Sequence, residues 1–234
     1  MARQASQTNQ KNNPRYERKF YIEHIDKYQV DHLIRLHPAM FVEIYHSRQI
    51  NNIYFDTCDN RFYHENINGD FDRVKVRIRW YGQLQGAASQ PTLELKIKKG
   101  PLGYKESYRL GSFQVDNNLS ASDIRQVLQR ADLPENLKHK LASLEPVIFN
   151  SYSRKYYLSS TVDLRLTIDW AMACCRFDRQ YNTFALHRQY QDSTIVELKY
   201  DADKDRQVRQ HCQDMPFTMT KSSKYVNAIE KLFY

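Results

Sequence analysis

The sequence predicts an α+β fold, in which helices are inserted into and appended to an antiparallel β-sheet. Strand-like segments dominate the order along the 234 residues. Charged and apolar residues also alternate in four of these segments: 75–80, 93–98, 165–169 and 196–200. Successive side chains of a strand point to opposite faces, so each segment turns an apolar face to a core and a charged face away from it. A closed sheet with a charged lumen can gather such charges without burying them unpaired.

Composition favours one domain with an anionic partner. Hydrophobic residues make up 41% of the chain and include 17 Tyr and 11 Phe, which is ample for a core. Residues 1–14 are rich in Gln, Asn, Ser and Thr and predict a disordered tail, so the domain is expected to cover 15–234. The formal net charge of +8 favours nucleic acid, anionic lipid, nucleotide or polyphosphate as partner without choosing among them.

The four cysteines and the hydropathy of the chain point to a cytoplasmic protein. No Cys-x-x-Cys pair occurs, so the cysteines are interpreted as reduced thiols rather than metal ligands. The first residues lack the apolar run of a signal peptide. No stretch approaches the roughly 20 apolar residues of a membrane span, so no direct membrane insertion is expected.

The first half of the chain is predicted to be mostly strands. Asp26 would cap a helix that runs to about Leu36, because apolar residues recur there at helical spacing and Pro38 follows. Apolar alternation bounded by turn residues predicts strands at 15–22, 41–45, 50–55, 73–81, 92–98 and 104–110. Irregular structure is expected at 60–69 and 82–91.

The second half opens with two predicted helices. The first begins near Ser120 and the second runs from Pro134 to about Leu144. Strands are then predicted at 147–158, 164–170, 174–177, 184–187 and 194–200. Two further helices are expected at 203–212 and 225–233.

Eight short motifs, taken in chain order, form a recognisable set: 16–20, 52–57, 75–82, 93–96, 151–157, 165–169, 196–200 and 221–225. This set resembles the VTC domain, the polyphosphate polymerase domain of the vacuolar transporter chaperone. That family lies within the CYTH-like superfamily of triphosphate tunnel metalloenzymes. Each motif alone is weak, but eight motifs in order are specific, and they cover nearly everything from about residue 15 onward.

The resemblance implies an antiparallel eight-stranded β-barrel whose lumen is a tunnel for triphosphate and a divalent metal, Mn²⁺ or Mg²⁺. In that family a nucleoside triphosphate donates its terminal phosphoryl group to a growing polyphosphate. The implied partners are therefore nucleoside triphosphate and pyrophosphate or polyphosphate, and a separately encoded membrane protein is a further candidate. Nucleic acid is not expected, because the basic residues alternate within strands instead of forming a surface run with interleaved aromatics.

The resemblance also assigns roles to residues. Four catalytic positions are implied: Arg77, Arg79, Lys96 and Arg154. The implied substrate-binding residues are Lys19, Lys105, Arg165, Lys199, Lys221, Ser223 and Lys224. Glu197 is the implied metal ligand, and Glu17 and Glu94 are further candidates for that role.

The residue types suit this chemistry. Phosphoryl transfer needs charge neutralisation and positioning more than a covalent nucleophile, and the arginine fork binds two phosphate oxygens at once. Arg77 and Arg79 are two apart in a strand, so they share a face at a separation of about 7 Å. Mg²⁺ and Mn²⁺ favour one or two carboxylates with phosphate oxygens and water. For Glu17 and Glu94, pairing with Lys19 and Lys96 is preferred over metal binding.

Two departures from the family pattern leave alternatives open. The chain lacks the N-terminal regulatory domain and the C-terminal membrane spans of the fungal proteins, so it resembles the stand-alone bacterial form. Ser107 stands where relatives often carry a second base, which weakens the expectation of turnover. A triphosphatase of the same superfamily is the first alternative, although Arg15 replaces the first acid of its Glu-x-Glu-x-Lys strand. The second is a non-catalytic module that senses polyphosphate or nucleotide.

Overall fold

The structure is a computed structural model that describes residues 15–100, 102–178, 182 and 189–234. Its strands are β1 (Arg15–Ile22), β2 (Phe41–Asp56), β3 (Asp72–Tyr81), β4 (Gly86–Ala88), β5 (Thr92–Lys99), β6 (Leu102–Arg109), β7 (Phe113–Val115), β8 (Glu145–Ser159), β9 (Arg165–Arg176), β10 (Gln189–Gln191) and β11 (Thr194–Asp201). Its helices are α1 (Lys27–Arg35), α2 (Arg61–Asn68), α3 (Ala121–Arg130), α4 (Glu135–Ala142), α5 (Asp205–Gln213) and α6 (Lys224–Phe233).

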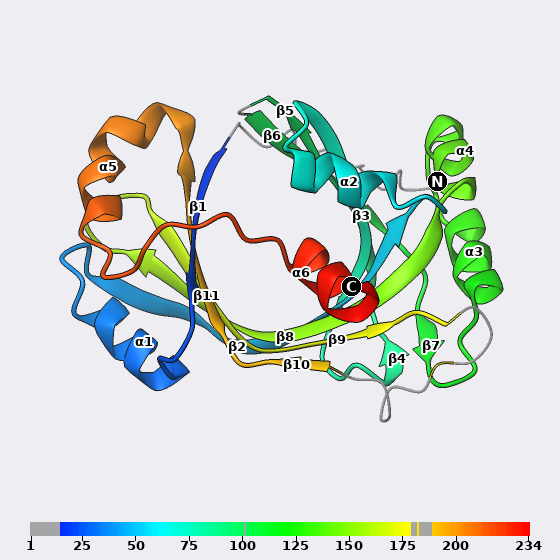
Figure 1. The fold of residues 1–234 in the computed structure, drawn as a ribbon, viewed down its shortest axis with the longest axis horizontal. Helices are drawn as coiled ribbons and strands as arrows, with labels where there is room; N and C mark the ends of the chain where they lie inside the picture. The colour runs from blue at the N-terminus through cyan, green and yellow to red at the C-terminus, as the bar shows by residue number, and fades with distance from the viewer. Residues whose placement is uncertain (1–14, 101, 179–181, 183–188) are drawn as a thin grey trace, which may run out of the picture.

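One large antiparallel sheet organises these elements. Its strands follow the order β1-β11-β9-β8-β2-β3-β5-β6, and β10 pairs with β9. The sheet curls into a ring, in which β8 and β9 connect a wall made of β1 and β11 to a wall made of β3, β5 and β6 (Figure 1). The strands β4 and β7 form a separate two-stranded ribbon beside it.

The ring has a seam between its edge strands, β1 and β6. Within the described residues, no backbone ladder joins these two strands. An ion pair spans the seam instead, with Lys96 Nζ on β5 2.5 Å from Glu17 Oε2 on β1. The predicted α+β fold around an eight-stranded antiparallel sheet is confirmed, and a side-chain contact bridges the edges where a fully hydrogen-bonded barrel would have a ladder.

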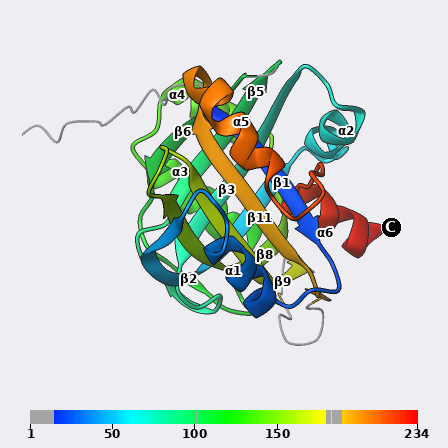
Figure 2. The same cartoon turned by 90° about the vertical axis from the view of Figure 1, so that its left-hand side faces the viewer.

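The apolar faces of the strands point out of the ring and are covered by helices. On one side, α3 and α4 pack over β3 and β5, where Trp80, Ile78 and Leu93 are buried. On the other side, α1 and α5 lie over β1 and β11, where Phe20 and Val196 are buried (Figure 2). Because these faces form two outer cores, the alternate, charged side chains are left on the concave face of the ring.

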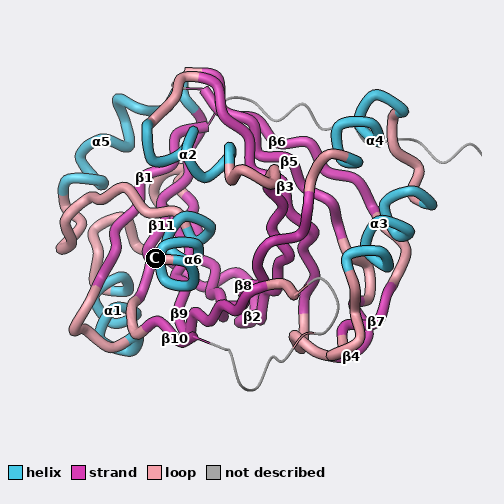
Figure 3. The backbone as a smooth tube through the Cα atoms, turned by 45° about the vertical axis from the view of Figure 1, so that its right-hand side comes forward, coloured by secondary structure: helices cyan, strands magenta, loops and turns pink. Residues whose placement is uncertain are grey.

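Helix α6 lies across one end of the ring (Figures 1 and 3). Its residues Tyr225 and Ile229 pack with Ile148 of β8 and with other apolar residues of β2, α2 and β9. The hydroxyl of Tyr225 also donates to the buried carboxylate of Asp56 at the end of β2. This packing carries the first residues of α6 to the concave face.

Two long strands replace pairs of shorter predicted ones. The strands expected at 41–45 and 50–55 are one continuous strand, β2, with irregular register on either side of Tyr45. Those expected at 164–170 and 174–177 are the single strand β9, which is kinked at Ala171, where φ is +50°. Bulges keep both strands paired through these irregular positions.

Helix α2 lies where irregular structure was expected. The carboxylate of Asp56 accepts hydrogen bonds from the backbone amides of Phe62 and Tyr63, at 2.8 and 3.0 Å, and so satisfies the first turn. Asn60, the residue before the helix, has a left-handed backbone with φ of +55° and makes no side-chain cap. The cap therefore comes from a residue outside the usual capping position, which local sequence patterns do not indicate. The ribbon of β4 and β7 was not predicted either.

The structure also tests the expected helix cap, the cysteines and the membrane spans. Asp26 caps α1 as predicted, accepting from two backbone amides of the first turn. The four cysteines are free. The expected tail at 1–14 and the expected strand at 184–187 lie outside the described residues. Among the helices that the structure describes, none has the length and apolar character needed to cross a membrane.

Replacing Asp56 with alanine should destabilise the fold. Asp56 is fully buried and accepts from the amides of Thr57, Phe62 and Tyr63 and from the Tyr225 hydroxyl. Leaving these donors unpaired should lower the free energy of unfolding by about 3 kcal/mol or more, measured by chemical denaturation. Asp132→Ala, on an exposed position, is the matched control. A loss below about 1 kcal/mol in Asp56→Ala would show that this carboxylate does not hold α2 and α6 together.

Candidate functional site

Charged side chains cover the concave face of the ring. On β3, Lys75, Arg77 and Arg79 alternate with the core residues of the outer face. The same alternation on the other strands brings Glu94, Lys96, Arg154, Asp169, Glu197, Lys199, Glu17 and Lys19 to this face. Basic groups outnumber carboxylates in this set, so the face as a whole favours an anion.

Glu94 is the centre of a first cluster. Its Oε2 accepts from Arg77 Nη2 and Nε at 2.6 and 2.9 Å, while its Oε1 accepts from Arg79 Nε at 3.0 Å and from Lys105 Nζ at 3.1 Å. Glu94 is only 2% exposed. Burial alone would raise the pKa of Glu94, but Arg77, Arg79 and Lys105 hold it well below its ordinary value. The carboxylate is therefore ionised, and it fixes the orientation of two arginine forks.

Asp169 organises a second cluster beside the first. It is fully buried and binds Arg154 through both oxygens, at 2.5 and 2.6 Å. Lys224, the first residue of α6, donates to the same carboxylate at 2.5 Å. Arg154 and Lys224 also lie over the ring of Tyr152, at 5.2 and 4.7 Å from its centroid. This cluster ties the start of α6 to β8 and β9 within the ring.

Glu197 and Glu17 form a third cluster along β1 and β11. Lys199 Nζ lies between them, 3.2 Å from Glu197 Oε2 and 3.9 Å from Glu17 Oε1. Lys19 Nζ lies 3.7 Å from Glu197 Oε1, and Arg154 Nη2 lies 3.6 Å from Glu197 Oε2. Burial opposes ionisation of Glu197, yet Lys199 and Lys19 hold its pKa well below the ordinary value. This carboxylate is ionised as well.

The third cluster can accommodate a divalent cation only with help from a ligand. In the described part of the chain, no group of three or more His, Cys, Asp or Glu residues could hold a metal ion. The ammonium of Lys199 nevertheless lies within ion-pair distance of both Glu197 and Glu17, so these two carboxylates are close to one another. The buried hydroxyl of Thr167, whose residue pairs with Glu197 in the β9–β11 ladder, has no hydrogen-bond partner. Two carboxylates and an unused hydroxyl fit Mg²⁺ or Mn²⁺ if phosphate oxygens complete the coordination.

The expected ion pairs within single strands are not the ones that form. Glu17 pairs with Lys96 and Lys199 instead of Lys19, and Glu94 pairs with residues of β3 and β6 instead of Lys96. Residues two apart on a strand are about 7 Å apart, whereas directly opposed residues on neighbouring strands are about 5 Å apart. Arg77 faces Glu94 and Lys199 faces Glu17 in this way, whereas Lys96 reaches Glu17 across the seam.

Lys75 is a lumen residue that was not selected from the sequence. Its Nζ donates to Ser223 Oγ at 2.8 Å, at the start of α6. Burial, with the nearby charges of Lys19 and Lys96, holds the pKa of Lys75 well below its ordinary value. The sequence does indicate this position, because Lys75 begins the same alternation of basic and apolar residues that contains Arg77 and Arg79.

The segment before α6 reaches the same region. Ser223 caps the helix by accepting from the amide of Val226, and Lys19 Nζ donates to the carbonyl of Ser222 at 3.1 Å. Burial and the neighbouring lysines lower the pKa of Lys19 to about 8. Amides at the start of a helix, beside several lysines, form an environment that suits phosphate.

Two predicted ligands stand apart from these clusters. Arg165 pairs with Lys199 in the β9–β11 ladder but is exposed, and no carboxylate of the described residues lies within ion-pair distance of it. Lys221 is exposed as well, and it contributes to a lowered pKa of Lys98. Both residues lie at the margin of the charged face rather than within it.

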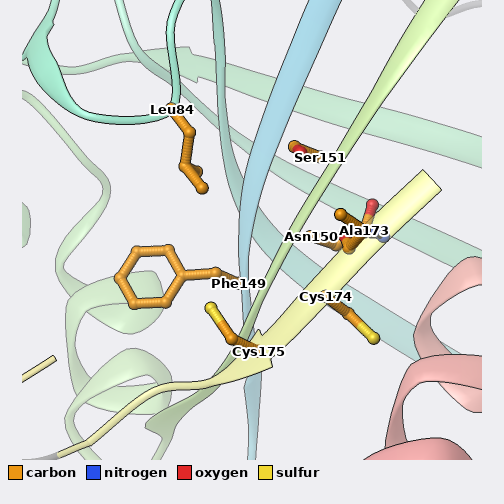
Figure 4. A pocket seen from close by; sticks show the side chains of 7 residues that line it. All are labelled: Leu84, Phe149, Asn150, Ser151, Ala173, Cys174 and Cys175. Atoms are coloured by element: carbon orange, nitrogen blue, oxygen red, sulfur yellow. Dashed lines mark hydrogen bonds between the residues drawn. The ribbon is translucent and has the colours of Figure 1, made fainter. Parts of the chain in front are cut away.

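A small depression on β8 and β9 is separate from the charged face. Its lining includes Leu84, Phe149 and Cys175, which belong to the outer core, along with Cys174 (Figure 4). None of the charged residues described above takes part in it. We assign no function to this depression.

The family model of the VTC domain matches residues 14–233. Among solved structures, a candidate adenylate cyclase from Bacillus halodurans matches with a TM-score of 0.50 at 15% identity, covering 93% of this chain and 96% of that one. A candidate adenylyl cyclase from Hippeastrum, described as having a dominant triphosphatase activity, matches with a TM-score of 0.49 at 12% identity, covering 94% and 98%. No curated protein matches significantly. The structural likenesses concern the fold alone.

Arg77→Ala should weaken triphosphate binding while the fold survives. The variant loses one fork from the concave face, and Glu94 keeps Arg79 and Lys105 as partners. Affinity for inorganic tripolyphosphate, measured by calorimetry, should fall roughly 10- to 150-fold, as expected for a charge-assisted hydrogen bond. Unchanged affinity in a folded variant would show that phosphate does not contact this fork.

Triphosphate binding should also cause Lys75 to take up a proton. Its pKa is low in the free protein, and a bound anion raises it, so a proton is gained at pH values between the free and bound pKa. Calorimetric titrations with tripolyphosphate, in buffers of different ionisation enthalpy, measure this uptake. Lys75→Met should reduce it, and Lys140→Met, on an exposed helix position, should not. Equal uptake in wild type and Lys75→Met would assign the proton to another group.

Proposed function

The chain belongs to the VTC domain family, and from this premise we propose that it transfers phosphoryl groups from nucleoside triphosphate to polyphosphate with the help of Mn²⁺ or Mg²⁺. One observation carries the proposal. Three buried, ionised carboxylates, Glu94, Asp169 and Glu197, each hold two or more basic side chains on the concave face. The bases are thereby fixed in position and still exceed the acids in number.

Such a face suits the chemistry of phosphoryl transfer. The reaction depends on positioning and on neutralising charge at the phosphate oxygens, more than on any covalent step by the protein. Arg77 and Arg79, oriented by Glu94, present two forks on adjacent lumen positions of β3. Arg154 and Lys224, oriented by Asp169, present two further donors from β8 and α6. We infer that these four side chains hold the phosphates of the donor nucleotide and of the acceptor chain.

The remaining proposed roles are divided between metal and substrate binding. Glu197 and Glu17, with Thr167 nearby, would hold the divalent ion, which supplies neutralising charge to the transferred phosphoryl group. Glu94 is better suited to orienting arginines, because Arg77, Arg79 and Lys105 donate hydrogen bonds to it at 2.6, 3.0 and 3.1 Å. The three bases around Glu197 lie farther away, at 3.2, 3.6 and 3.7 Å. Lys96, Lys199, Lys19 and Lys75, with Ser223, would contact the chain of phosphates along the lumen. Arg165 and Lys221 would attract it from the margin.

Two departures have structural counterparts: Ser107 departs from the family pattern, and Arg15 departs from the Glu-x-Glu-x-Lys strand of the triphosphatases. Ser107 is the cross-strand neighbour of Glu94, but Lys105 provides the third cation of that cluster. Arg15 forms an ion pair with Asp201 at 2.9 Å, at the exposed end of β1. Both arrangements are compatible with the polymerase-like activity proposed.

The proposal is tested by incubating the purified protein with ATP and either Mn²⁺ or Mg²⁺, then resolving the products. Long-chain polyphosphate supports it. Orthophosphate without polymer would assign the protein to triphosphate hydrolysis instead. If neither product forms with any divalent metal and triphosphate binding is retained, the protein is a non-catalytic binding module. A search for a separately encoded membrane partner would follow only if long-chain polyphosphate is formed.

Glu197→Gln should separate metal binding from anion binding. The change keeps the size of the side chain but removes its charge, so Mn²⁺ affinity should fall and phosphoryl transfer should fall further. Metal-free tripolyphosphate binding should be unchanged or tighter, because one repulsive carboxylate has left the lumen. Glu135→Gln, whose side chain is 77% exposed, is the matched control. A wild-type Mn²⁺ response with a lowered melting temperature would make Glu197 a structural ion-pair partner only.

A further inference from the structure

Arg48 is held by three tyrosine rings on the concave side of the sheet. Its guanidinium carbon lies 5.1 Å from the ring centroid of Tyr45, 5.5 Å from that of Tyr81 and 5.7 Å from that of Tyr156. The rings of Tyr45 and Tyr156 meet edge to face, with centroids 5.8 Å apart. These four residues form the Arg48 cluster, and none of them belongs to the three ion-pair clusters.

Strand register places the Arg48 cluster next to the phosphate-binding bases. Tyr81 lies two residues beyond Arg79 on the same face of β3, and the Arg79 guanidinium lies 4.6 Å from the Tyr81 ring. Tyr156 lies two residues beyond Arg154 on β8, and Arg48 pairs directly with Arg154 in the β2–β8 ladder. Residues two apart on a strand lie on the same face about 7 Å apart. The Arg48 cluster therefore extends the lumen surface by one side chain along each of these strands.

The cluster lies at the end of the lumen away from α6. On β3, Lys75 contacts Ser223 at the start of α6, whereas Tyr81 is six residues further along, a strand length of roughly 20 Å. On β8, Ile148 packs against α6, and Tyr156 lies eight residues beyond it. A triphosphate held between Glu94 and Asp169 thus has the α6 end on one side and the Arg48 cluster on the other.

The Arg48 cluster is open to solvent and differs in chemistry from the rest of the lumen. Tyr45 is 54% exposed and Tyr81 is 41% exposed. Arg77, Arg79 and Arg154 are each paired with a carboxylate, but among the described residues no carboxylate lies within ion-pair distance of Arg48. Its hydrogen-bond donors are therefore not taken by an acid, and its plane is flanked by aromatic rings.

We propose that the Arg48 cluster binds the nucleobase and ribose of a nucleoside triphosphate whose phosphates occupy the lumen. Every nucleobase offers a π-face that stacks on tyrosine rings or on a guanidinium plane. The free donors of Arg48 suit the phosphate nearest the ribose or an acceptor on the edge of the base. Stacking is tolerant of base identity, so the cluster distinguishes nucleotide from inorganic polyphosphate rather than one base from another.

This inference rests on the proposed function, since it requires the lumen to bind triphosphate. Its test compares ATP with inorganic tripolyphosphate in calorimetric titrations of wild type and Tyr45→Ala. Tyr45 contacts Arg48 and Tyr156 but none of the ion-paired arginines of the lumen, so its loss disturbs the Arg48 cluster and leaves the phosphate-binding bases in place. Affinity for ATP should fall roughly 5- to 150-fold. Affinity for tripolyphosphate should stay within about 2-fold of wild type.

Two further variants complete the comparison. Tyr45→Phe keeps the ring and should retain most of the ATP affinity, while Tyr28→Ala removes a tyrosine that is 73% exposed on α1 and should change neither titration. Melting curves verify that each variant is folded. Equal losses for both ligands in Tyr45→Ala, or no loss for either, would overturn the inference. Wild-type protein that binds tripolyphosphate as tightly as ATP would also overturn it, leaving the phosphate site intact. Wild-type protein that binds neither ligand would overturn the proposed function itself.

Discussion

A buried carboxylate must be paired, and this constraint organises the concave face of the ring. Glu94, Asp169 and Glu197 are almost completely removed from solvent, yet the bases around them keep them ionised. Each carboxylate fixes the direction of the bases that it holds and reduces the repulsion among them. Arginine forks and ammonium groups are thus in place before any ligand arrives, so little side-chain ordering remains to oppose binding.

The same constraint connects the site to the fold. Asp169 lies at the centre of β9 and binds both Arg154 of β8 and Lys224 of α6, so the start of α6 belongs to the lumen. Asp56 holds the next residue, Tyr225, at the end of β2. Charged faces can point inward along all these strands because their apolar faces are covered from outside by α1, α3, α4 and α5. Apolar and charged residues alternate along each strand. This alternation places the helices outside the ring and the charges inside it.

That alternation made the strands, their faces and many of the lumen residues predictable from the sequence. The partners of each carboxylate were not predictable, because they depend on cross-strand register: Glu94 meets Lys105 only through the β5–β6 pairing. The role of Asp169 was not predictable either, since nothing local indicates that Lys224 reaches it from a distant helix. Helix α2 was missed because its cap is Asp56, four residues before the left-handed Asn60. Arg48 was passed over because irregular register, which the sequence does not reveal, places it beside Tyr45.

In the proposed function, the concave face binds the phosphates of a nucleotide. The most direct measurement is a crystal structure of the protein with a non-hydrolysable ATP analogue and Mn²⁺. We predict that the phosphate oxygens contact Arg77, Arg79, Arg154 and Lys224 and that the ion lies beside Glu197. Phosphates bound on the outer surface, with the ion pairs of Glu94 and Asp169 unchanged and no ligand between them, would contradict it.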